Sequence, residues 1–360
     1  MKLFNVGAMR SANDGARLSA ANDLVQRTLA RHGLVPHSTQ AIQQKMPDLP
    51  SLDSMLDQFA GFGSNTREFD GTVSEGAQFK RDTFTCQAGS RTYRTYVPAS
   101  ATEGVTGIVM MLHGCTQTPE DFAMGTGMNA LAEQHRFAVV YPAQSRGDNA
   151  QSCWNWFSQS DQRRGKGEPL ILAGIASSVA KEHGITRDQT FVAGLSAGAA
   201  MAAILGETYD DVFAAVGAHS GLPAGAAKNV ASAFAAMSGT ALDLGTPPVS
   251  AITTRTIVFH GTADTTVHPS NGDAIVRRAV DMNARQSIET TCDGDTAGRQ
   301  FSRTIFSDLQ GTPIVERWEI EGQGHAWSGG KSTGSYTDAK GPDASAEMIR
   351  FFFNTADKDL

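Results

Sequence analysis

Residues 191–201 read FVAGLSAGAAM, an apolar run followed by Gly-Leu-Ser-Ala-Gly and then by alanines. Glycines on both sides of Ser196 indicate a backbone bend too tight for a Cβ atom, where a buried strand gives way to a helix. Such a turn, a nucleophile elbow, holds a serine hydroxyl above a sheet. The alternative is an ordinary glycine-rich loop, because a chain with 37 glycines can contain one G-x-S-x-G pattern without special meaning. The rest of the chain has to decide between the two.

Composition indicates a globular protein with a substantial core. Hydrophobic residues make up 40% of the 360 residues and charged residues 19%. A net charge of −7 and the lack of a basic run argue against a nucleic-acid-binding protein. No stretch approaches the roughly 18–20 apolar residues that a membrane-spanning helix needs. We therefore expect no nucleic-acid partner and no membrane span.

Cysteine spacing argues against a metal site. The four cysteines are Cys86, Cys115, Cys153 and Cys292, and none forms a C-x-x-C pair. They are too few for a disulfide scaffold and wrongly spaced for a structural zinc site. No G-x-G-x-x-G element is placed to bind a dinucleotide either. The sequence thus predicts neither a structural zinc site nor a dinucleotide-binding element.

The first 78 residues differ from the rest of the chain. Apolar residues recur at helical spacing over 11–32, and prolines among polar residues follow. We expect a helix and an irregular leader over 1–78, then an α/β domain over 79–360. The N-terminus lacks the continuous apolar segment of a secretory signal, which predicts a cytoplasmic protein. The alternative is a secreted protein whose signal has been removed.

From residue 79 onward, strand and helix patterns alternate. Strands in the middle of this domain are predicted over 107–114, 137–142, 189–194, 212–221, 255–261 and 315–322, after an antiparallel pair over 79–85 and 91–98. Helices are predicted over 119–135, 168–184, 197–208 and 343–354, and another after residue 270. This alternation predicts an α/β fold with a mostly parallel central sheet and helices on both faces.

Three polar residues that follow predicted strands occur along the chain in the order serine, aspartate, histidine. Serine is a poor nucleophile unless a base and a group that orients the base lie beside it. Ser196 is followed along the chain by Asp264 and then by His325, each in a glycine-containing loop after a strand. The order serine, acid, histidine is that of the α/β-hydrolases. We therefore predict an α/β-hydrolase with a Ser196–His325–Asp264 triad.

Competing residues exist for two members of this triad. Asp273 and Asp281 could replace Asp264, but both fall in the helix predicted after residue 270. His260 ends a predicted strand, so it competes with His325 or is a buried structural histidine.

A serine hydrolase also needs two N–H groups that bind the oxyanion. One is expected from Ala197, the residue after the nucleophile. The other is expected from the loop after the strand over 107–114, where the backbone N–H of Cys115 is the best candidate. His113 would brace that loop; the alternative is a strand-end histidine without a role.

Several motifs agree in order and spacing with one known family. The segments HGCTQTPEDFA, VVYPAQ, CWNWF, GLSAGAAM, HSGLPAG, HGTADTTV and GQGHAW resemble the poly(3-hydroxybutyrate) depolymerase family of esterases over roughly residues 79–353. The resemblance implies an α/β-hydrolase fold and serine esterase chemistry without a metal or an organic cofactor. It also implies that Ser196, Asp264 and His325 form the triad, and that His113 and Cys115 belong to the oxyanion loop.

The resemblance leaves the substrate open between two classes of ester. We expect a carboxylic ester hydrolase that cleaves short-chain esters through an acyl-enzyme, with poly(3-hydroxybutyrate) or its oligomers as the first candidates. The alternative is a feruloyl or acetylxylan esterase, since these share the superfamily. The partner is therefore an ester or polyester, and the oligomeric state is not indicated.

Aromatic residues and two cysteines are expected near the site. Trp154 and Trp156 of CWNWF, and Trp327 beside His325, are expected to line the substrate pocket with His113; the alternative is that they are core residues. Cys115 and Cys153 fall in two loops that should converge. They can form a disulfide in an oxidising compartment, or remain reduced thiols.

Overall fold

The computed structural model describes residues 73–240, 244, 254–283 and 287–353. The helix expected over 11–32, and the leader up to residue 72, lie outside the described residues. The division of the chain at residue 78 therefore remains a prediction.

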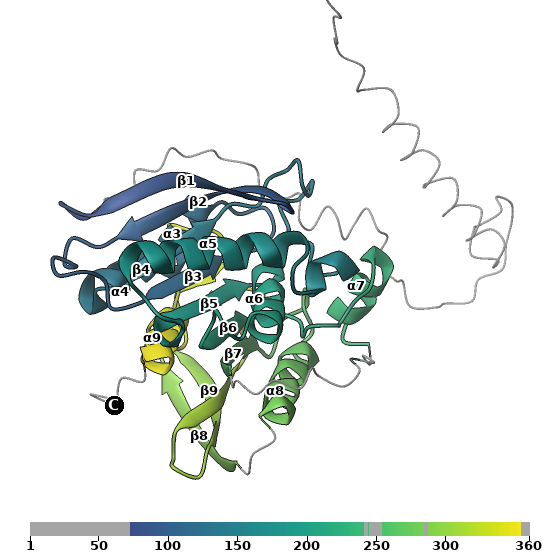
Figure 1. Ribbon diagram of the computed structural model, residues 1–360. Helices are drawn as coiled ribbons and strands as arrows, with labels where there is room; N and C mark the ends of the chain where they lie inside the picture. The colour runs from purple at the N-terminus through teal and green to yellow at the C-terminus, as the bar shows by residue number, and fades with distance from the viewer. Residues whose placement is uncertain (1–72, 241–243, 245–253, 284–286, 354–360) are drawn as a thin grey trace, which may run out of the picture. The chain divides into compact units, whose positions relative to one another are not determined.

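A ten-stranded mixed sheet forms the centre of the domain, with the strand order β1-β2-β4-β3-β5-β6-β7-β10-β9-β8 (Figure 1). The six strands from β4 to β10 run parallel, and antiparallel strands extend the sheet at both edges. The strands are β1 Gln78–Cys86, β2 Gly89–Val97, β3 Ile108–Leu112, β4 Ala138–Pro142, β5 Thr190–Leu195, β6 Ala215–His219, β7 Arg255–Gly261, β8 Ile288–Thr296, β9 Arg299–Ser307 and β10 Pro313–Ile320. Two short strands, β11 Trp327–Ser328 and β12 Thr337–Asp338, pair separately.

Helices cover both faces of the sheet (Figure 1). One face packs against α5, α6 and α8, and the other against α3, α4 and α9. The helices are α3 Pro119–Thr126, α4 Met128–His135, α5 Gly167–His183, α6 Ala197–Thr208, α7 Val230–Met237, α8 Ser270–Met282 and α9 Ala344–Phe353. No helix within the described ranges has the length and apolar character to cross a membrane.

Burial on both faces explains why the central strands read as unbroken apolar runs. Every residue of β3 is buried. Met110 belongs to the cluster under α5 and α6, whereas the neighbouring Val109 and Met111 belong to the cluster under α9. Successive side chains of a strand point to opposite faces, so a strand covered on both sides needs apolar residues at every position. The expected mostly parallel sheet is therefore confirmed.

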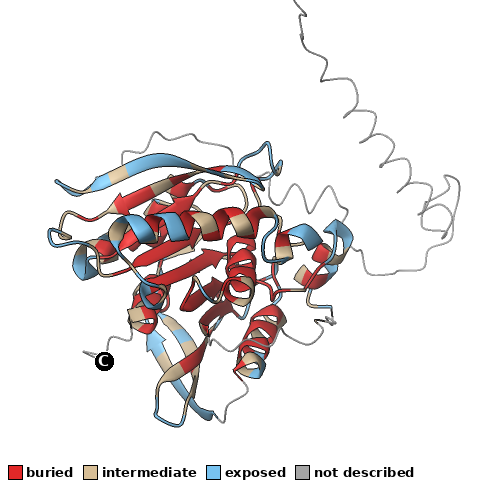
Figure 2. Ribbon diagram, in the orientation of Figure 1, coloured by how far each residue is buried: buried red, intermediate tan, exposed pale blue. Residues whose placement is uncertain are grey.

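Several elements differ from the expectation, among them α7, β11 and β12, which were not predicted. The single helix expected over 119–135 is two helices, because Gly127 adopts φ 65°, which ends α3 and begins α4. The hairpin of β8 and β9 was not expected. Almost all of β8 is exposed (Figure 2), so its sequence lacks the apolar alternation by which a half-buried strand is recognised.

Candidate active site

Ser196 occupies a sharp turn between β5 and α6. Its backbone has φ 58° and ψ −119°, a conformation that residues with a side chain rarely adopt. The flanking glycines make this turn possible. A Cβ on Gly198 would lie 2.1 Å from the carbonyl oxygen of Leu112, and one on Gly194 would lie 2.4 Å from the carbonyl carbon of Gly198. The start of α6 therefore packs directly against the end of β3, which a larger residue would prevent.

Asp264 and His325 meet at the same edge of the sheet. Asp264 follows β7 and His325 follows β10, and these neighbouring strands run parallel. The Nδ1 atom of His325 lies 2.8 Å from Oδ2 of Asp264. The other carboxylate oxygen of Asp264 accepts the backbone N–H groups of Thr266 and Val267, each at 2.9 Å. Both oxygens of the buried carboxylate are thereby held in place.

The environment keeps Asp264 ionised. Burial alone would raise the pKa of this carboxyl group, but hydrogen bonding to His260 and His325, with further help from the Val267 N–H, holds the pKa well below its usual range. A carboxylate in this state can fix the tautomer of His325 and stabilise its protonated form.

The residues that competed for these positions have other contacts. The Nε2 atom of His260 lies 2.8 Å from the carbonyl oxygen of Val267 and 3.5 Å from Asp264 Oδ2, so His260 supports the aspartate from a buried position. Asp273 lies on α8 and pairs with Arg317. Asp281 is exposed near the end of α8. The carboxylate that pairs with His325 is that of Asp264.

His219 connects the serine turn with the segment after His325. Its carbonyl oxygen accepts the backbone N–H of Ser196 at 2.9 Å, and its Nε2 accepts the N–H of Ser328 at 3.0 Å. The ring stacks between Phe259 and Trp327. Burial, followed by the charges of His260 and His325, lowers the pKa of His219 to about 3, so the ring is neutral. This uncharged histidine joins two loops that are far apart in the sequence.

In the loop over residues 113–117, here called the oxyanion loop, three backbone N–H groups donate to acceptors within the protein. The N–H of Gly114 donates to Gln117 Oε1 at 2.9 Å, that of Thr116 to the Gln151 carbonyl at 2.7 Å, and that of Gln117 to the Gly114 carbonyl at 3.3 Å. Within the described part of the chain, the N–H of Cys115 has no acceptor. The N–H of Ala197 belongs to the first turn of α6, where backbone donors have no partner within the helix. These are the two N–H groups named from the sequence, and their role as oxyanion donors remains a prediction.

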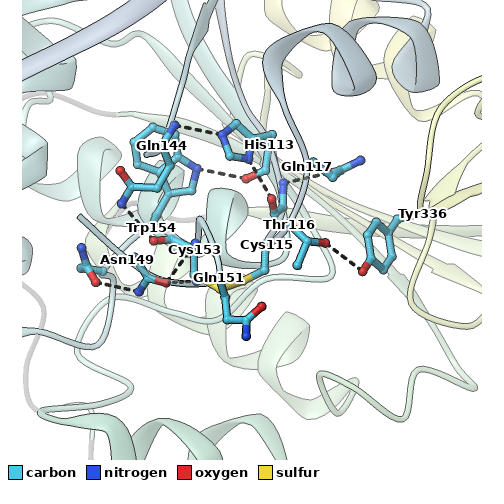
Figure 3. Close-up of a disulfide and its surroundings, with 12 residues drawn as sticks. His113, Cys115, Thr116, Gln117, Gln144, Asn149, Gln151, Cys153, Trp154 and Tyr336 are labelled. Atoms are coloured by element: carbon cyan, nitrogen blue, oxygen red, sulfur yellow. Dashed lines mark hydrogen bonds between the residues drawn. A yellow bond between two sulfur atoms is a disulfide. The ribbon is translucent and has the colours of Figure 1, made fainter. Parts of the chain in front are cut away.

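A disulfide between Cys115 and Cys153 ties the oxyanion loop to the segment around Trp154 (Figure 3). The indole N–H of Trp154 donates to the carbonyl oxygen of His113 at 3.0 Å. The oxyanion loop is therefore held by one covalent bond and by hydrogen bonds on several sides.

Comparison with known proteins places this chain in a family. Residues 91–299 match the family described as esterase PHB depolymerase. The chain belongs to this family. The matched range includes Ser196, Asp264 and the oxyanion loop, whereas His325 lies beyond it.

Individual relatives agree with this assignment. Poly(3-hydroxyalkanoate) depolymerase C of Paucimonas lemoignei is 34% identical over 239 residues, which cover 63% of this chain and 56% of that protein. Acetylxylan esterase A of Talaromyces purpureogenus is 31% identical over 192 residues, 49% of each chain. The chain thus spans about half the length of these curated relatives.

A solved structure confirms the α/β-hydrolase fold. The acetyl xylan esterase from Aspergillus awamori superposes with a TM-score of 0.63 at 21% sequence identity, over 77% of this chain and 99% of that one.

The four aromatic residues expected in a substrate pocket are all buried. Trp154 and Trp327 are 0% and 1% exposed, His113 is 1% and Trp156 is 5%. Trp327 donates its indole N–H to the Ser345 hydroxyl at 3.0 Å. In this depolymerase-family chain, the contact of any of these buried rings with a substrate remains a prediction.

Sequence reasoning missed several polar residues that hold the oxyanion loop. Gln117 donates to Ser335, and the hydroxyls of Thr116 and Tyr336 lie 3.1 Å apart. Gln144 contacts His113 and Cys153. Thr116 and Gln117 lie inside the motif HGCTQTPEDFA and Gln144 inside VVYPAQ, which were the signals available, whereas Ser335 and Tyr336 carry no local pattern. The described residues include no cluster of three or more His, Cys, Asp or Glu side chains able to hold a metal ion.

Proposed function

We propose that the protein is a serine esterase that hydrolyses short-chain carboxylic esters through an acyl-enzyme, with Ser196, His325 and Asp264 as its triad. The observation that carries this proposal is the hydrogen bond between His325 and the buried Asp264, at the sheet edge where β5 presents Ser196 in a strained turn. Membership in an esterase family supports the same chemistry.

The proposed reaction begins at the Ser196 hydroxyl. As Oγ attacks the ester carbonyl carbon, Nε2 of His325 accepts the hydroxyl proton, and the tetrahedral intermediate forms. Its oxyanion accepts hydrogen bonds from the N–H groups of Cys115 and Ala197. The C–O bond to the leaving alcohol then breaks, and His325 returns the proton to that oxygen.

Water completes the cycle. It attacks the acyl-enzyme while His325 accepts one of its protons, and the acid is released as His325 passes that proton to Oγ of Ser196. In the free protein, the Ser196 hydroxyl has no hydrogen-bond partner among the described residues. Catalytic hydrogen bonds of this kind are often formed only when the substrate is bound.

We propose poly(3-hydroxybutyrate) or its oligomers as the first substrate candidates. A relative named as a poly(3-hydroxyalkanoate) depolymerase supports them. Acetylxylan is the second candidate, because a curated relative and a solved structure with the same fold are named as acetylxylan esterases. Feruloyl esters remain the further alternative from the sequence.

The disulfide favours the secreted alternative for the location of this protein. Disulfides persist in oxidising compartments and are rare where glutathione keeps thiols reduced. Cys115 of the oxyanion loop is paired with Cys153, so we propose that the protein works in an oxidising compartment.

The deciding experiment measures release of 3-hydroxybutyrate from an amorphous poly(3-hydroxybutyrate) suspension, with acetylxylan and a short-chain nitrophenyl ester in parallel. We expect release by the wild type, and a loss of several orders of magnitude in Ser196→Ala with the fold retained. Cleavage of acetylxylan alone would move the substrate to the second candidate. Hydrolysis of all three substrates at the wild-type rate by Ser196→Ala would overturn the triad.

A further inference from the structure

Gln144 lies outside the proposed triad but contacts His113 of the oxyanion loop. It follows β4 and is buried. Its backbone N–H donates to Nε2 of His113 at 3.1 Å, and its side-chain amide donates to the carbonyl oxygen of Cys153 at 2.9 Å (Figure 3). One residue therefore reaches both the start of the oxyanion loop and the disulfide segment that is joined to it.

We propose that Gln144, held between Arg91 and Glu168, is a positioning residue that sets the place of the Cys115 N–H in the oxyanion hole. The proposal rests on the esterase function proposed above and concerns the geometry of that same site.

The first step of the argument is the state of His113. Nδ1 of His113 lies 2.8 Å from the carbonyl oxygen of Gly114, and a carbonyl can only accept. Nδ1 therefore carries the hydrogen, and Nε2 is the acceptor that receives the Gln144 N–H. Both ring nitrogens are used, so the ring has one orientation between Gln144 and the oxyanion loop.

The second step is the link through the disulfide. Cys153 is bonded covalently to Cys115, whose N–H is the proposed oxyanion donor. The side-chain amide of Gln144 holds the backbone of Cys153. Displacement of Gln144 would consequently release two restraints on Cys115, one through His113 and one through Cys153.

The third step is the orientation of the Gln144 side chain itself. Its Oε1 accepts a hydrogen bond from Arg91 Nη1, and its Nε2 donates to Glu168 Oε1. Rotation of the amide by half a turn would place its NH₂ group against a guanidinium and its oxygen against a carboxylate. The donors of Arg91 and the acceptor oxygen of Glu168 thus favour the orientation in which the NH₂ group faces Cys153.

Glu168 is well held for this purpose. It lies in the first turn of α5 and is buried. Its carboxylate accepts the backbone N–H of Asn155 at 2.7 Å and the side-chain amide of Asn155 at 2.9 Å, and it lies 3.5 Å from Arg91 Nη2. The anchor of the network is therefore a helix of the core, which moves less than a loop does.

A purely structural role is the alternative that the experiment has to separate from this proposal. The test compares Gln144→Met, which keeps similar volume but removes the side-chain hydrogen bonds, and Glu168→Gln with the wild type. Glu316→Gln is the matched control. Glu316 is fully buried and paired with Arg303 and Arg350, yet it lies on β10 away from the oxyanion loop.

The kinetic readout compares a nitrophenyl ester with the matching thionoester. Sulfur accepts hydrogen bonds weakly, so the thionoester depends little on the oxyanion donors. We expect Gln144→Met and Glu168→Gln to lower kcat for the oxygen ester about 10- to 100-fold, somewhat less than outright removal of a donor. KM and the thionoester rate should change little. An unchanged ester-to-thionoester ratio in folded Gln144→Met, or an equal change in Glu316→Gln, would overturn the proposal.

Amide hydrogen exchange over residues 113–117 supplies a readout that needs no turnover. We expect faster exchange there in Gln144→Met and Glu168→Gln and wild-type exchange in Glu316→Gln. Wild-type exchange in all three variants would contradict the anchoring. If the wild type hydrolyses neither ester, the proposed function fails, while this exchange measurement still decides whether Gln144 holds the oxyanion loop.

Discussion

Several non-glycine residues around the site have a positive φ, a backbone conformation that residues with a Cβ atom rarely adopt. Seven described non-glycine residues have positive φ, and five of them belong to the segments around the site: Thr116, Ser152, Ser196, Ser220 and Tyr336. Such conformations cost of order 1–3 kcal/mol each and persist only where the surroundings impose them. Gly194 and Gly198 make the positive φ of Ser196 possible, because they let α6 approach the end of β3.

Gly198 offers a direct test of this close approach. In Gly198→Ala the new methyl group would lie 2.1 Å from the Leu112 carbonyl oxygen, so α6 or the oxyanion loop must shift. We expect a loss of stability of about 1–3 kcal/mol from overpacking and a fall in esterase kcat of about 100-fold from misplacement of Ala197. Urea unfolding and ester kinetics measure the two effects.

Gly147→Ala is the control for this variant, because the nearest atom to its new Cβ would be the Ser145 hydroxyl at an ordinary 3.5 Å. A Gly198→Ala protein as stable and active as Gly147→Ala would contradict the role given to this glycine.

At the scale of elements, the oxyanion loop depends on segments from three other parts of the chain. The segment after β4 supports it through Gln144, the segment before η1 (Gln159–Gln162) through the disulfide, and the segment between β11 and β12 through Ser335 and Tyr336. The loop carries the proposed oxyanion donor, so its geometry is set by elements that contribute no residue to the triad.

Reduction of the disulfide should therefore affect catalysis as well as stability. We expect Cys153→Ser to lose about 2–4 kcal/mol of unfolding free energy, and to lose at least tenfold in kcat with little change in KM, because the Cys115 N–H is no longer held. Treatment of the wild type with a thiol reductant should have the same effect and be reversible on oxidation.

Cys292→Ser is the control, since Cys292 is an exposed free cysteine on β8. Full activity in a protein in which a thiol reagent shows Cys115 and Cys153 to be reduced would disprove the dependence of catalysis on the disulfide.

Across the whole molecule, buried histidines couple folding to pH. Burial lowers the pKa of His113 to about 4, and burial with the charges of His260 and His325 lowers that of His219 to about 3. In the unfolded chain both groups titrate near 6.5. The unfolded state therefore binds more protons, and the stability these two groups contribute is complete above pH 6.5 and is lost as pH falls toward 4 and 3.

Glu168 contributes with the opposite sign. Burial raises its pKa to about 7, despite hydrogen bonds from Asn155 and the charge of Arg91. A raised carboxyl pKa means that the folded state binds more protons than the unfolded state. Its contribution is therefore complete below the unfolded value near 4.3 and is lost as pH rises to about 7.

His219→Gln separates the histidine contribution from the others. The glutamine amide oxygen can still accept the Ser328 N–H, but the side chain no longer titrates. Between pH 6.5 and 4.5 we expect the wild type to lose about 2 kcal/mol more unfolding free energy than His219→Gln does. Urea unfolding at these two pH values measures the difference, and parallel slopes for the two proteins would show that His219 is not the group responsible.

The sequence alone determined the succession of the central strands and helices along the chain and the residues at the strand ends. These signals are local: an unbroken apolar run requires burial on both faces, and Gly-Leu-Ser-Ala-Gly requires a turn without Cβ atoms, so both can be read over about ten residues. The break at Gly127 and the exposed β8–β9 hairpin escaped prediction. The apolar pattern continues past Gly127, and β8 has no buried face to create a pattern.

Tertiary structure alone decided how the oxyanion loop is held. Arg91 lies on β2, Gln144 in the loop after β4 and Glu168 on α5. The local sequence around each residue does not predict which residue it will contact. Their contacts exist because the sheet places β2 beside β4 and α5 packs over both β1 and β2. A buried polar group must find its partner wherever packing brings one within hydrogen-bonding distance, and that distance is a property of the folded chain.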